Sequence, residues 1–330
     1  MQMLMAAWAS QAIAAIARLV IPDLLERHGA ATARELAERH GVEAEPAALA
    51  RALRACASLG IFTEQADGRF GPTPLSRALT LDAPGSVRRF AELIGGRWWT
   101  LFGGLPEALR TGRNQSKALL GREPWEPSSP RETEEFSESM RSRRDSTRTF
   151  VDRCDLASAR TLVDVGGGLG HVAIAALARY PHLRAVVLDR PQVIAIAERH
   201  AAAEDPAVRA RVTFASGDMF EEVPAGDTFL LRSIVHDWDD SRAIRVLANC
   251  RARLEGTGRV LCVDNVLPPL GDTGASGTKL LDLLMLVSLP GRERVEAEWR
   301  ALFQAAGLAL DSVTPINPPS AECIIAGLPR

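Results

Sequence analysis

Residues 162–170 read LVDVGGGLG, and this stretch decides the fold of the 330-residue chain. Apolar residues typical of a strand run into a glycine-rich turn, and a helical segment follows from about His171. Glycine lets the backbone adopt torsions that other residues resist, and it lets a ligand approach closely. A strand, a glycine-rich turn and a helix in this order predict a nucleotide-binding α/β unit.

From Arg160 to the C-terminus, short β-prone runs alternate with helical segments. This alternation predicts an α/β, Rossmann-like fold, with a parallel sheet covered by helices on both faces. The last two runs have no helix-length segment between them, so we expect them to form an antiparallel pair at the sheet edge. The expected strands are Thr161–Val165, Arg184–Leu188, Arg211–Ala215, Asp227–Arg232, Arg259–Asp264, Leu308–Thr314 and Glu322–Ala326.

Three acidic residues lie at the C-terminal ends of three successive expected strands. The glycines have the spacing G-x-G-x-G behind Asp164, and a carboxylate there suits a cofactor with an ammonium group better than a pyrophosphate. Asp189 ends the next strand, where a carboxylate can accept both ribose hydroxyls. Asp218 follows the third strand and can meet the adenine amino group, with Met219 and Phe220 against the ring. Each acid alone is also typical of a turn or cap, but ligands bind at this edge of a sheet.

The first 95 residues predict helices followed by a hairpin. Thr32 and Glu35 form a capping box for one helix, and Pro46 begins the next. Asp67-Gly68 between β-prone residues predicts the hairpin, which completes the order of a winged helix. This region contains ten basic and ten acidic residues. Since DNA binding needs a positive excess, we expect dimerisation or covering of the substrate instead.

Composition limits the remaining functions. Hydrophobic residues make up 46% of the chain and charged residues 24%, with a net charge of −2, which favours neither nucleic acid nor anionic lipid as a partner. The five cysteines form no C-x-x-C pair, which favours reduced thiols in the core. Residues 6–25 are largely apolar, but Arg18 and Asp23 interrupt them. No apolar run therefore reaches the length of about 18 residues that a membrane span needs. We expect a buried amphipathic helix and a cytoplasmic protein.

A mostly helical bridge is expected between the two halves. It contains Trp98 and Trp99, which can line an aromatic pocket or seal a domain interface, and Trp98 is a candidate substrate-binding residue. The predicted domains are a winged-helix domain at 1–95, the bridge at 96–155 and the cofactor-binding domain at 156–330.

Two further motifs, IVHDWDD at 234–240 and GRER at 291–294, complete a pattern that covers nearly the whole chain. Together with the glycine-rich stretch, they resemble the small-molecule O-methyltransferase family, which includes plant phenylpropanoid and flavonoid enzymes and bacterial enzymes of natural-product biosynthesis. The resemblance implies S-adenosylmethionine as cofactor, a small aromatic hydroxyl compound as substrate and a homodimer. In such relatives the partner's N-terminal segment can close the pocket, which would involve Met5 and Trp8.

The resemblance also implies roles for single residues. His236 matches the general base, and Asp264 and Glu293 match two orienting acids, although the acid at 264 is commonly the longer glutamate in plant relatives. The candidate cofactor-binding residues are Gly166, Gly168, Asp189, Asp218, Met219, Phe220 and Arg232. The candidate substrate-binding residues are Met140, Asp237, Asp282, Met285 and Trp98.

The expected chemistry is an in-line displacement, in which holding the acceptor oxygen opposite the sulfonium supplies much of the rate. A base improves a neutral phenol, and a carboxylate behind the imidazole stabilises the imidazolium that forms. We expect no metal, because the histidines and acids show no ligand spacing. The alternative for His236 is a histidine at a helix start, where Asp237 and Asp239 serve as caps. The alternatives for the whole chain are a methyltransferase-fold enzyme that hydroxylates or decarboxylates, and a winged-helix DNA-binding regulator.

Overall fold

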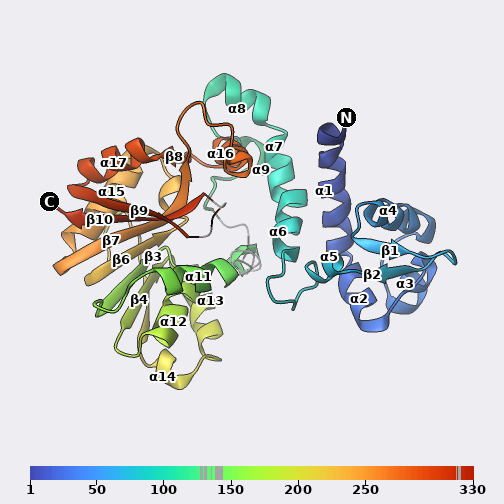
Figure 1. Cartoon of the computed structure of the whole chain (residues 1–330), viewed down its shortest axis with the longest axis horizontal. Helices are drawn as coiled ribbons and strands as arrows, with labels where there is room; N and C mark the ends of the chain where they lie inside the picture. Colours follow the sequence, from blue (N-terminus) through green and yellow to red (C-terminus); the bar gives the residue numbers. More distant parts are fainter. Residues whose placement is uncertain (127–128, 130–131, 135, 138–143, 317, 319–320) are drawn as a thin grey trace. The chain divides into compact units, whose positions relative to one another are not determined.

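The structure is a computed structural model that describes residues 1–126, 129, 132–134, 136–137, 144–316, 318 and 321–330, with only the backbone of 144–146. The chain divides into two compact units, residues 1–103 and residues 104–137 with 144–330 (Figure 1). Each unit has its own apolar core.

The first unit is helical with one small hairpin. The capping box at Thr32 is formed and Gly41 ends that helix in a left-handed conformation, with φ 70°. The hairpin turns at Gly68, φ 80°, so the predicted helix–helix–hairpin order is confirmed. The elements are α1 (Gln2–Arg18), α2 (Ile21–His28), α3 (Ala33–His40), α4 (Pro46–Ser58), β1 (Phe62–Glu64), β2 (Phe70–Pro72), α5 (Pro74–Arg77), α6 (Arg88–Leu93), η1 (Ile94–Trp98) and α7 (Trp99–Phe102).

The N-terminal apolar run differs from the expectation. It breaks at Val20, φ 61°, into α1 and α2, and only the C-terminal half of α1 is buried. Met3, Leu4 and Trp8 in its first half are 91%, 77% and 69% exposed. Within the described residues, no single helix has both the length and the apolarity of a membrane span, and α1 and α2 pass that test only when joined across their 58° bend.

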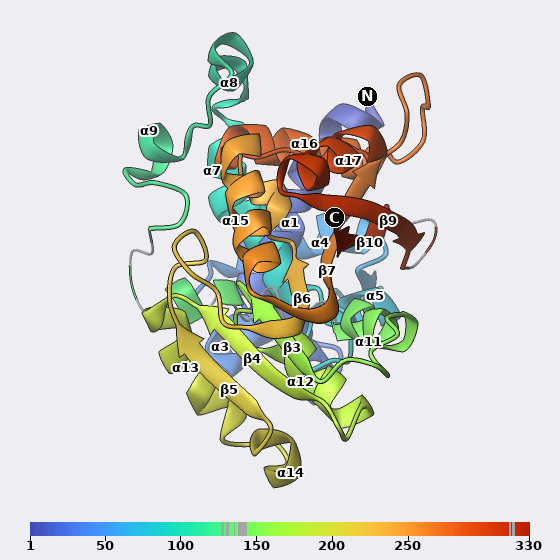
Figure 2. The same cartoon turned by 90° about the vertical axis from the view of Figure 1, so that its left-hand side faces the viewer.

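The second unit contains the predicted sheet, in the order β5-β4-β3-β6-β7-β10-β9, with β8 paired to β7 (Figure 2). Strands β3 to β7 are parallel to their neighbours, whereas β10 runs antiparallel to both β7 and β9, as expected. The strands are β3 (Thr161–Val165), β4 (Arg184–Asp189), β5 (Val212–Ser216), β6 (Gly226–Arg232), β7 (Leu254–Leu267), β8 (Arg294–Val295), β9 (Leu308–Pro315) and β10 (Glu322–Pro329).

Helices cover both faces of this sheet. Successive strand residues point to opposite faces, so Leu162 and Leu230 belong to one apolar core and Val163 and Phe229 to the other. All five cysteines are buried and free, which confirms the prediction of reduced thiols in the core. The helices of this unit are α8 (Leu105–Thr111), α9 (Ser116–Leu120), α11 (Arg144–Arg153), α12 (His171–Arg179), α13 (Pro191–Ala201), α14 (Pro206–Arg209), η2 (Val235–Asp237), α15 (Asp240–Ala252), α16 (Ser276–Ser288) and α17 (Glu296–Ala305).

Candidate active site

The glycine-rich loop lies at the carboxyl end of β3, where parallel strands of this fold bind ligands. Gly166, Gly168 and Gly170 have φ of 68°, 57° and 77°, a region that favours glycine. The N–H groups of Gly166 and Gly167 both donate to the carbonyl of Leu188 on β4, at 2.8 and 3.3 Å. The loop is therefore fixed to the neighbouring strand by its own backbone.

Two of the predicted acids lie directly against this loop. Asp189 accepts hydrogen bonds from the N–H groups of Gly168 at 2.9 Å and Arg190 at 2.7 Å, one on each carboxylate oxygen. Asp164 is 1% exposed, and a Cβ at Gly167 would lie only 2.6 Å from its Cγ. Burial raises the pKa of Asp189, and it raises that of Asp164 to about 7. A ligand cation would favour the ionised form of both acids.

The third acid forms a turn after β5. Asp218 accepts a hydrogen bond from the N–H of Phe220 at 2.8 Å, and the Met219 carbonyl accepts one from the side chain of Asn249 at 2.9 Å. Phe220 meets Trp238 edge to face, with ring centroids 4.8 Å apart. This turn places an aromatic surface and a carboxylate at the same sheet edge as the other two acids.

Arg232, the remaining predicted cofactor-binding residue, ends β6. Its guanidinium donates to Thr147 at 2.7 Å and forms an ion pair with Glu322 of β10 at 3.1 Å. Its charge also lowers the pKa of Asp164, against the larger effect of burial. Arg232 thus lies within electrostatic reach of the glycine-rich loop while its head group is held by α11 and β10.

His236 lies in η2, the short turn after β6, and is 8% exposed. Its Nδ1 lies 2.9 Å from Oε1 of Glu293, which also accepts a hydrogen bond from Asn265 at 3.1 Å. Asp264 on β7 comes within 3.7 Å of Nδ1, too far for a hydrogen bond. Since a carboxylate only accepts, the Glu293 contact places a proton on Nδ1 and leaves Nε2 as the basic atom of the neutral ring.

The imidazole is surrounded by negative charge. Besides Asp264 and Glu293, Asp237 lies 3.4 Å from Nε2. Burial alone lowers the pKa of His236, but the charges of Asp264 and Asp237 and the contact with Glu293 raise it to about 10. Burial raises the pKa values of Asp237 and Asp264 to about 7, against the lowering effect of His236. The cluster therefore has a strong affinity for protons and makes His236 a stronger base than a free imidazole.

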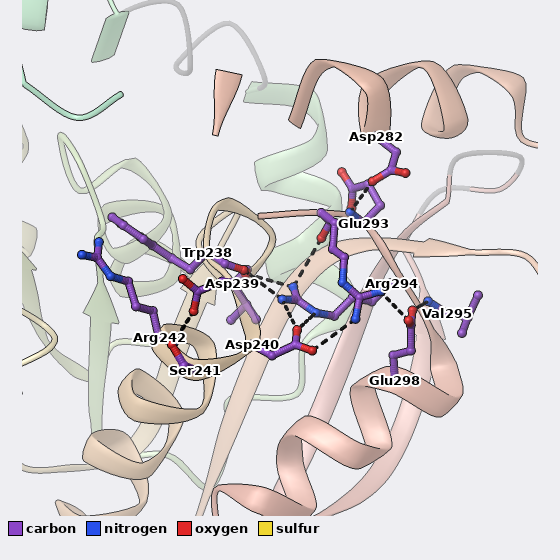
Figure 3. Close-up of polar contacts among 12 residues, drawn as sticks. Trp238, Asp239, Asp240, Ser241, Arg242, Asp282, Glu293, Arg294, Val295 and Glu298 are labelled. Carbon is purple, nitrogen blue, oxygen red and sulfur yellow. Dashed lines mark hydrogen bonds and ion pairs between the residues drawn. The ribbon is translucent and has the colours of Figure 1, made fainter. Parts of the chain in front are cut away.

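Of the predicted substrate-binding residues, Asp282 and Met285 lie on α16 in this unit. Asp282 accepts a hydrogen bond from the backbone N–H of Glu293 at 2.8 Å, as Figure 3 shows, and Met285 is buried. Trp98 belongs to the first unit, where it meets Phe90 edge to face at 5.4 Å. Met140 lies outside the described residues.

Sequence reasoning did not identify Asn265, Gly291 or Arg294 as parts of this site. Gly291 and Arg294 stand in the GRER motif, so their position was known although their contacts were not. A Cβ at Gly291 would lie 2.0 Å from the carbonyl oxygen of His236, so only glycine allows this approach. Asn265 follows Asp264 on the strand, and no pattern distinguishes it from any other polar residue at a strand end.

The residues at this edge fit S-adenosylmethionine. The donor set is acidic, with Asp164, Asp189 and Asp218 at the ends of three neighbouring strands, which suits a cofactor with a sulfonium and an ammonium group. The backbone at Gly168 is open, because a Cβ there would meet nothing within 4 Å. Asp189 keeps free lone pairs beside its two N–H contacts, as a ribose diol requires.

Comparison with known proteins agrees with this geometry. Residues 102–309 match the model of the O-methyltransferase domain, and residues 1–82 match that of the O-methyltransferase dimerisation domain. The phenazine O-methyltransferase PhzM of Lysobacter antibioticus is 34% identical over 319 residues, which cover 96% of this chain and 92% of the relative.

Solved structures extend the similarity to the fold and the cofactor. The crystal structure of LaPhzM superimposes with a TM-score of 0.91 at 33% identity, over 100% of this chain and 98% of that one. NcsB1, an O-methyltransferase of neocarzinostatin biosynthesis, was solved with S-adenosylmethionine and 2-hydroxy-5-methyl naphthoic acid. It has a TM-score of 0.83 and 28% identity, covering 98% of this chain and 96% of that one.

Proposed function

The chain belongs to the O-methyltransferase family and uses S-adenosylmethionine, and on this basis we propose that it methylates a hydroxyl group of a small aromatic natural product with His236 as general base. The aromatic acceptor is supported by relatives that are named for phenazine or were solved with a hydroxynaphthoic acid. The match to a dimerisation domain supports a homodimer.

The observation that carries the proposal is the buried pair of His236 and Glu293, 2.9 Å apart, beside the glycine-rich loop. The glycine-rich loop and the turn that carries His236 are close neighbours: a Cβ at Gly166 would lie only 2.4 Å from Cδ1 of Ile234, two residues before His236. A basic nitrogen and a loop suited to the methyl donor therefore share one edge of the sheet, as an in-line displacement requires.

The proton balance favours a phenolic acceptor. A phenol titrates near pH 10 and a free histidine near 6.5, so complete proton transfer between them costs roughly 5 kcal/mol. Because the surrounding acids raise the pKa of His236, transfer of the proton to the neutral imidazole costs less than transfer to a free histidine. When bound, S-adenosylmethionine supplies an electrophilic methyl group. Nε2 of His236 accepts the acceptor's proton as the oxygen attacks, and Glu293 and Asp264 stabilise the imidazolium that forms.

The remaining residues hold the reactants. Asp189 and the N–H groups of the glycine-rich loop suit the ribose and the amino-acid portion of the cofactor, and Asp218 with Phe220 suits the adenine. Asp282 and Met285 on α16, together with Asp237, are proposed to orient the acceptor ring. Met140, by the family resemblance, and Trp98, by its aromatic side chain, stay proposed acceptor contacts.

The proposal is tested with His236→Ala and the matched control His182→Ala, in which an exposed histidine is removed instead. We expect His236→Ala to lower kcat by about 10²–10⁴ and to leave the calorimetric affinity for S-adenosylmethionine nearly unchanged. His182→Ala should leave both values at the wild-type level. A loss below tenfold in His236→Ala would mean that proximity alone drives the reaction and that His236 is not the base.

A further inference from the structure

Arg294 is fully buried, at 0% exposure, although nothing in the proposed chemistry uses its charge. Its guanidinium donates to the carbonyl of Val235 at 3.1 Å and to that of Trp238 at 2.9 Å. These two carbonyls stand on either side of His236 and Asp237 in the chain. The same guanidinium forms an ion pair with Asp240 at the start of α15, with Oδ1 2.8 Å from Nη2 and 3.1 Å from Nε (Figure 3).

The segment 291–294, which contains Arg294, holds the turn at residues 235–238 in two further ways; this turn carries His236 and is called the base loop. Gly291 packs against its backbone so closely that an added Cβ would lie 2.0 Å from the His236 carbonyl oxygen. Glu293 holds the imidazole itself at 2.9 Å, and its own N–H is fixed by Asp282 at 2.8 Å. The segment therefore grips both the backbone and the side chain of the base loop.

From these contacts we propose that Arg294 is a positioning residue, which clamps the carbonyls on both sides of His236 and thereby sets the distance between the imidazole and Glu293. The inference rests on the proposed function, since it concerns the residue that acts there as the base. Arg294 is adjacent to Glu293 in the chain, so a guanidinium that grips the His236 loop fixes the two members of the pair to each other.

Arginine is required by the geometry of the acceptors. The planar guanidinium presents five N–H donors in a fixed fork, and here three of its nitrogens reach carbonyls on two sides and one carboxylate oxygen. A lysine carries its donors on one nitrogen at the end of a flexible stem, so it cannot reproduce the three-nitrogen fork that contacts Val235, Trp238 and Asp240 together. Arg294→Lys thus keeps the buried charge while it loses the clamp.

The clamp has a readout that a purely structural role lacks. His236 is faced by Asp237 on its own turn, by Asp264 on β7 and by Glu293 in the segment before β8, and these acids raise its pKa. If the loop is released, the imidazole moves away from Glu293 and Asp264, and its pKa falls toward 6.5. A general loss of folded protein would lower activity, but the molecules that remain folded would keep the titration of the wild-type protein.

The test compares Arg294→Lys with Arg292→Gln as a matched control. The side chain of Arg292 shares the partner Asp240, at 3.2 Å, and pairs with Glu298 of α17 rather than with the carbonyls of Val235 and Trp238. Asp240→Asn is the second variant, because Asp240 is half-exposed and its change leaves the buried core intact. The titration of His236 is followed by NMR on full-length protein with ¹³C-labelled histidine, and the resonance is assigned by its loss in His236→Ala.

We expect the His236 midpoint to fall by about one pH unit or more in Arg294→Lys, less in Asp240→Asn, and not at all in Arg292→Gln. With an acceptor, kcat should fall at least about tenfold in Arg294→Lys while the KM for S-adenosylmethionine stays unchanged. An unchanged His236 titration in folded Arg294→Lys overturns the inference. Should that variant not fold, an unchanged titration in Asp240→Asn overturns it. The titration needs no acceptor, so its outcome is separate from that of the methyl-transfer assay.

Discussion

At the scale of single residues, His236 faces more acid than one imidazolium can neutralise. Asp237, Asp264 and Glu293 all lie within 4 Å of its ring nitrogens and are almost fully buried. Because the pKa values of Asp237 and Asp264 are raised to about 7 and that of His236 to about 10, the two aspartates titrate around neutral pH, whereas His236 keeps its proton well above it. The neutral imidazole that acts as base is therefore the minor form at pH 7.

This charge balance predicts the pH dependence of the reaction. Since the folded enzyme must lose a proton to expose the neutral base, kcat/KM should rise with pH beyond 8 rather than level off near 6.5. Asp264→Asn removes a charge that raises the pKa, so the rise should move to lower pH. The measurement is the pH profile of kcat/KM for both proteins with the same phenolic acceptor, so that any ionisation of the acceptor is common to the two profiles. A midpoint identical in the two proteins would contradict the electrostatic account.

Asp189 gives a second prediction at this scale. Its carboxylate is fixed by the N–H groups of Gly168 and Arg190, so it is preorganised for the ribose hydroxyls. Asp189→Ala removes the two charge-assisted hydrogen bonds that the carboxylate is proposed to accept from the ribose hydroxyls. We therefore expect the affinity for S-adenosylmethionine to fall by about 10²-fold or more. Calorimetric titration measures this, with His182→Ala as the control. Unchanged affinity would place the ribose elsewhere.

The sequence identified the residue types of this cluster but not its distances. Motifs at 162–170, 234–240 and 291–294 pointed to His236, Glu293 and the acids at the strand ends. They did not show that Asp264 stops 3.7 Å from Nδ1 while Glu293 reaches 2.9 Å, because that difference depends on where β7 and the segment before β8 lie. The contact of Asn265 with Glu293 could not be predicted for the same reason, since it depends on the same two segments.

At the scale of elements, the segment before β8 is held against the η2 turn by backbone contact. Gly291→Ala would insert a methyl group 2.0 Å from a carbonyl oxygen, so the turn that carries His236 must shift. We expect kcat to fall at least about tenfold and the protein to lose about 1–3 kcal/mol of stability. Thermal melts and steady-state kinetics measure the two effects.

The matched control for this prediction is Gly277→Ala. Gly277 lies in the first turn of α16 and its added Cβ would meet nothing within 4 Å. Alanine has the better helix propensity, so stability should be unchanged or slightly higher. Equal behaviour of the two glycine variants would show that the contact between the segment and the turn does not matter.

Regular elements were predictable because their periodicity follows from burial. The parallel strands, the antiparallel pair β9 and β10, and the capping box at Thr32 all lie where the pattern put them. The pattern missed the extension of β7 to Leu254–Leu267 and the two-residue strand β8. Two residues are too few to show a period, so the pairing of Arg294 with Val266 and of Val295 with Leu267 could not be read from alternation.

At the scale of the whole molecule, the exposed half of α1 needs an explanation. Met3, Leu4 and Trp8 are largely exposed in the single chain, within the region that matches a dimerisation domain. Exposed apolar side chains grouped in this way are typical of an interaction surface. We interpret them as part of the contact with a second copy of the chain, which also accounts for the apolar sequence that suggested a buried helix.

This interpretation predicts the oligomeric state. The wild-type protein should elute with about twice the 35.6 kDa of one chain, measured by light scattering on a sizing column. The double variant Leu4→Glu, Trp8→Glu should shift toward the monomer, because burying two carboxylates in an apolar contact is costly. Arg34→Glu, on the exposed side of α3, serves as a charge-matched control. A variant that remains fully dimeric would move the interface away from α1.

The most direct measurement of the central claim uses S-adenosylmethionine with a deuterated methyl group and a panel of hydroxylated phenazines, benzoic acids and naphthoic acids. Product masses are read by mass spectrometry. The account predicts that at least one phenol gains the deuterated methyl group as an ether, with S-adenosylhomocysteine formed in equal amount. A product that gains oxygen or loses carbon dioxide without the label, or no labelled product from a protein that binds the cofactor, would contradict it.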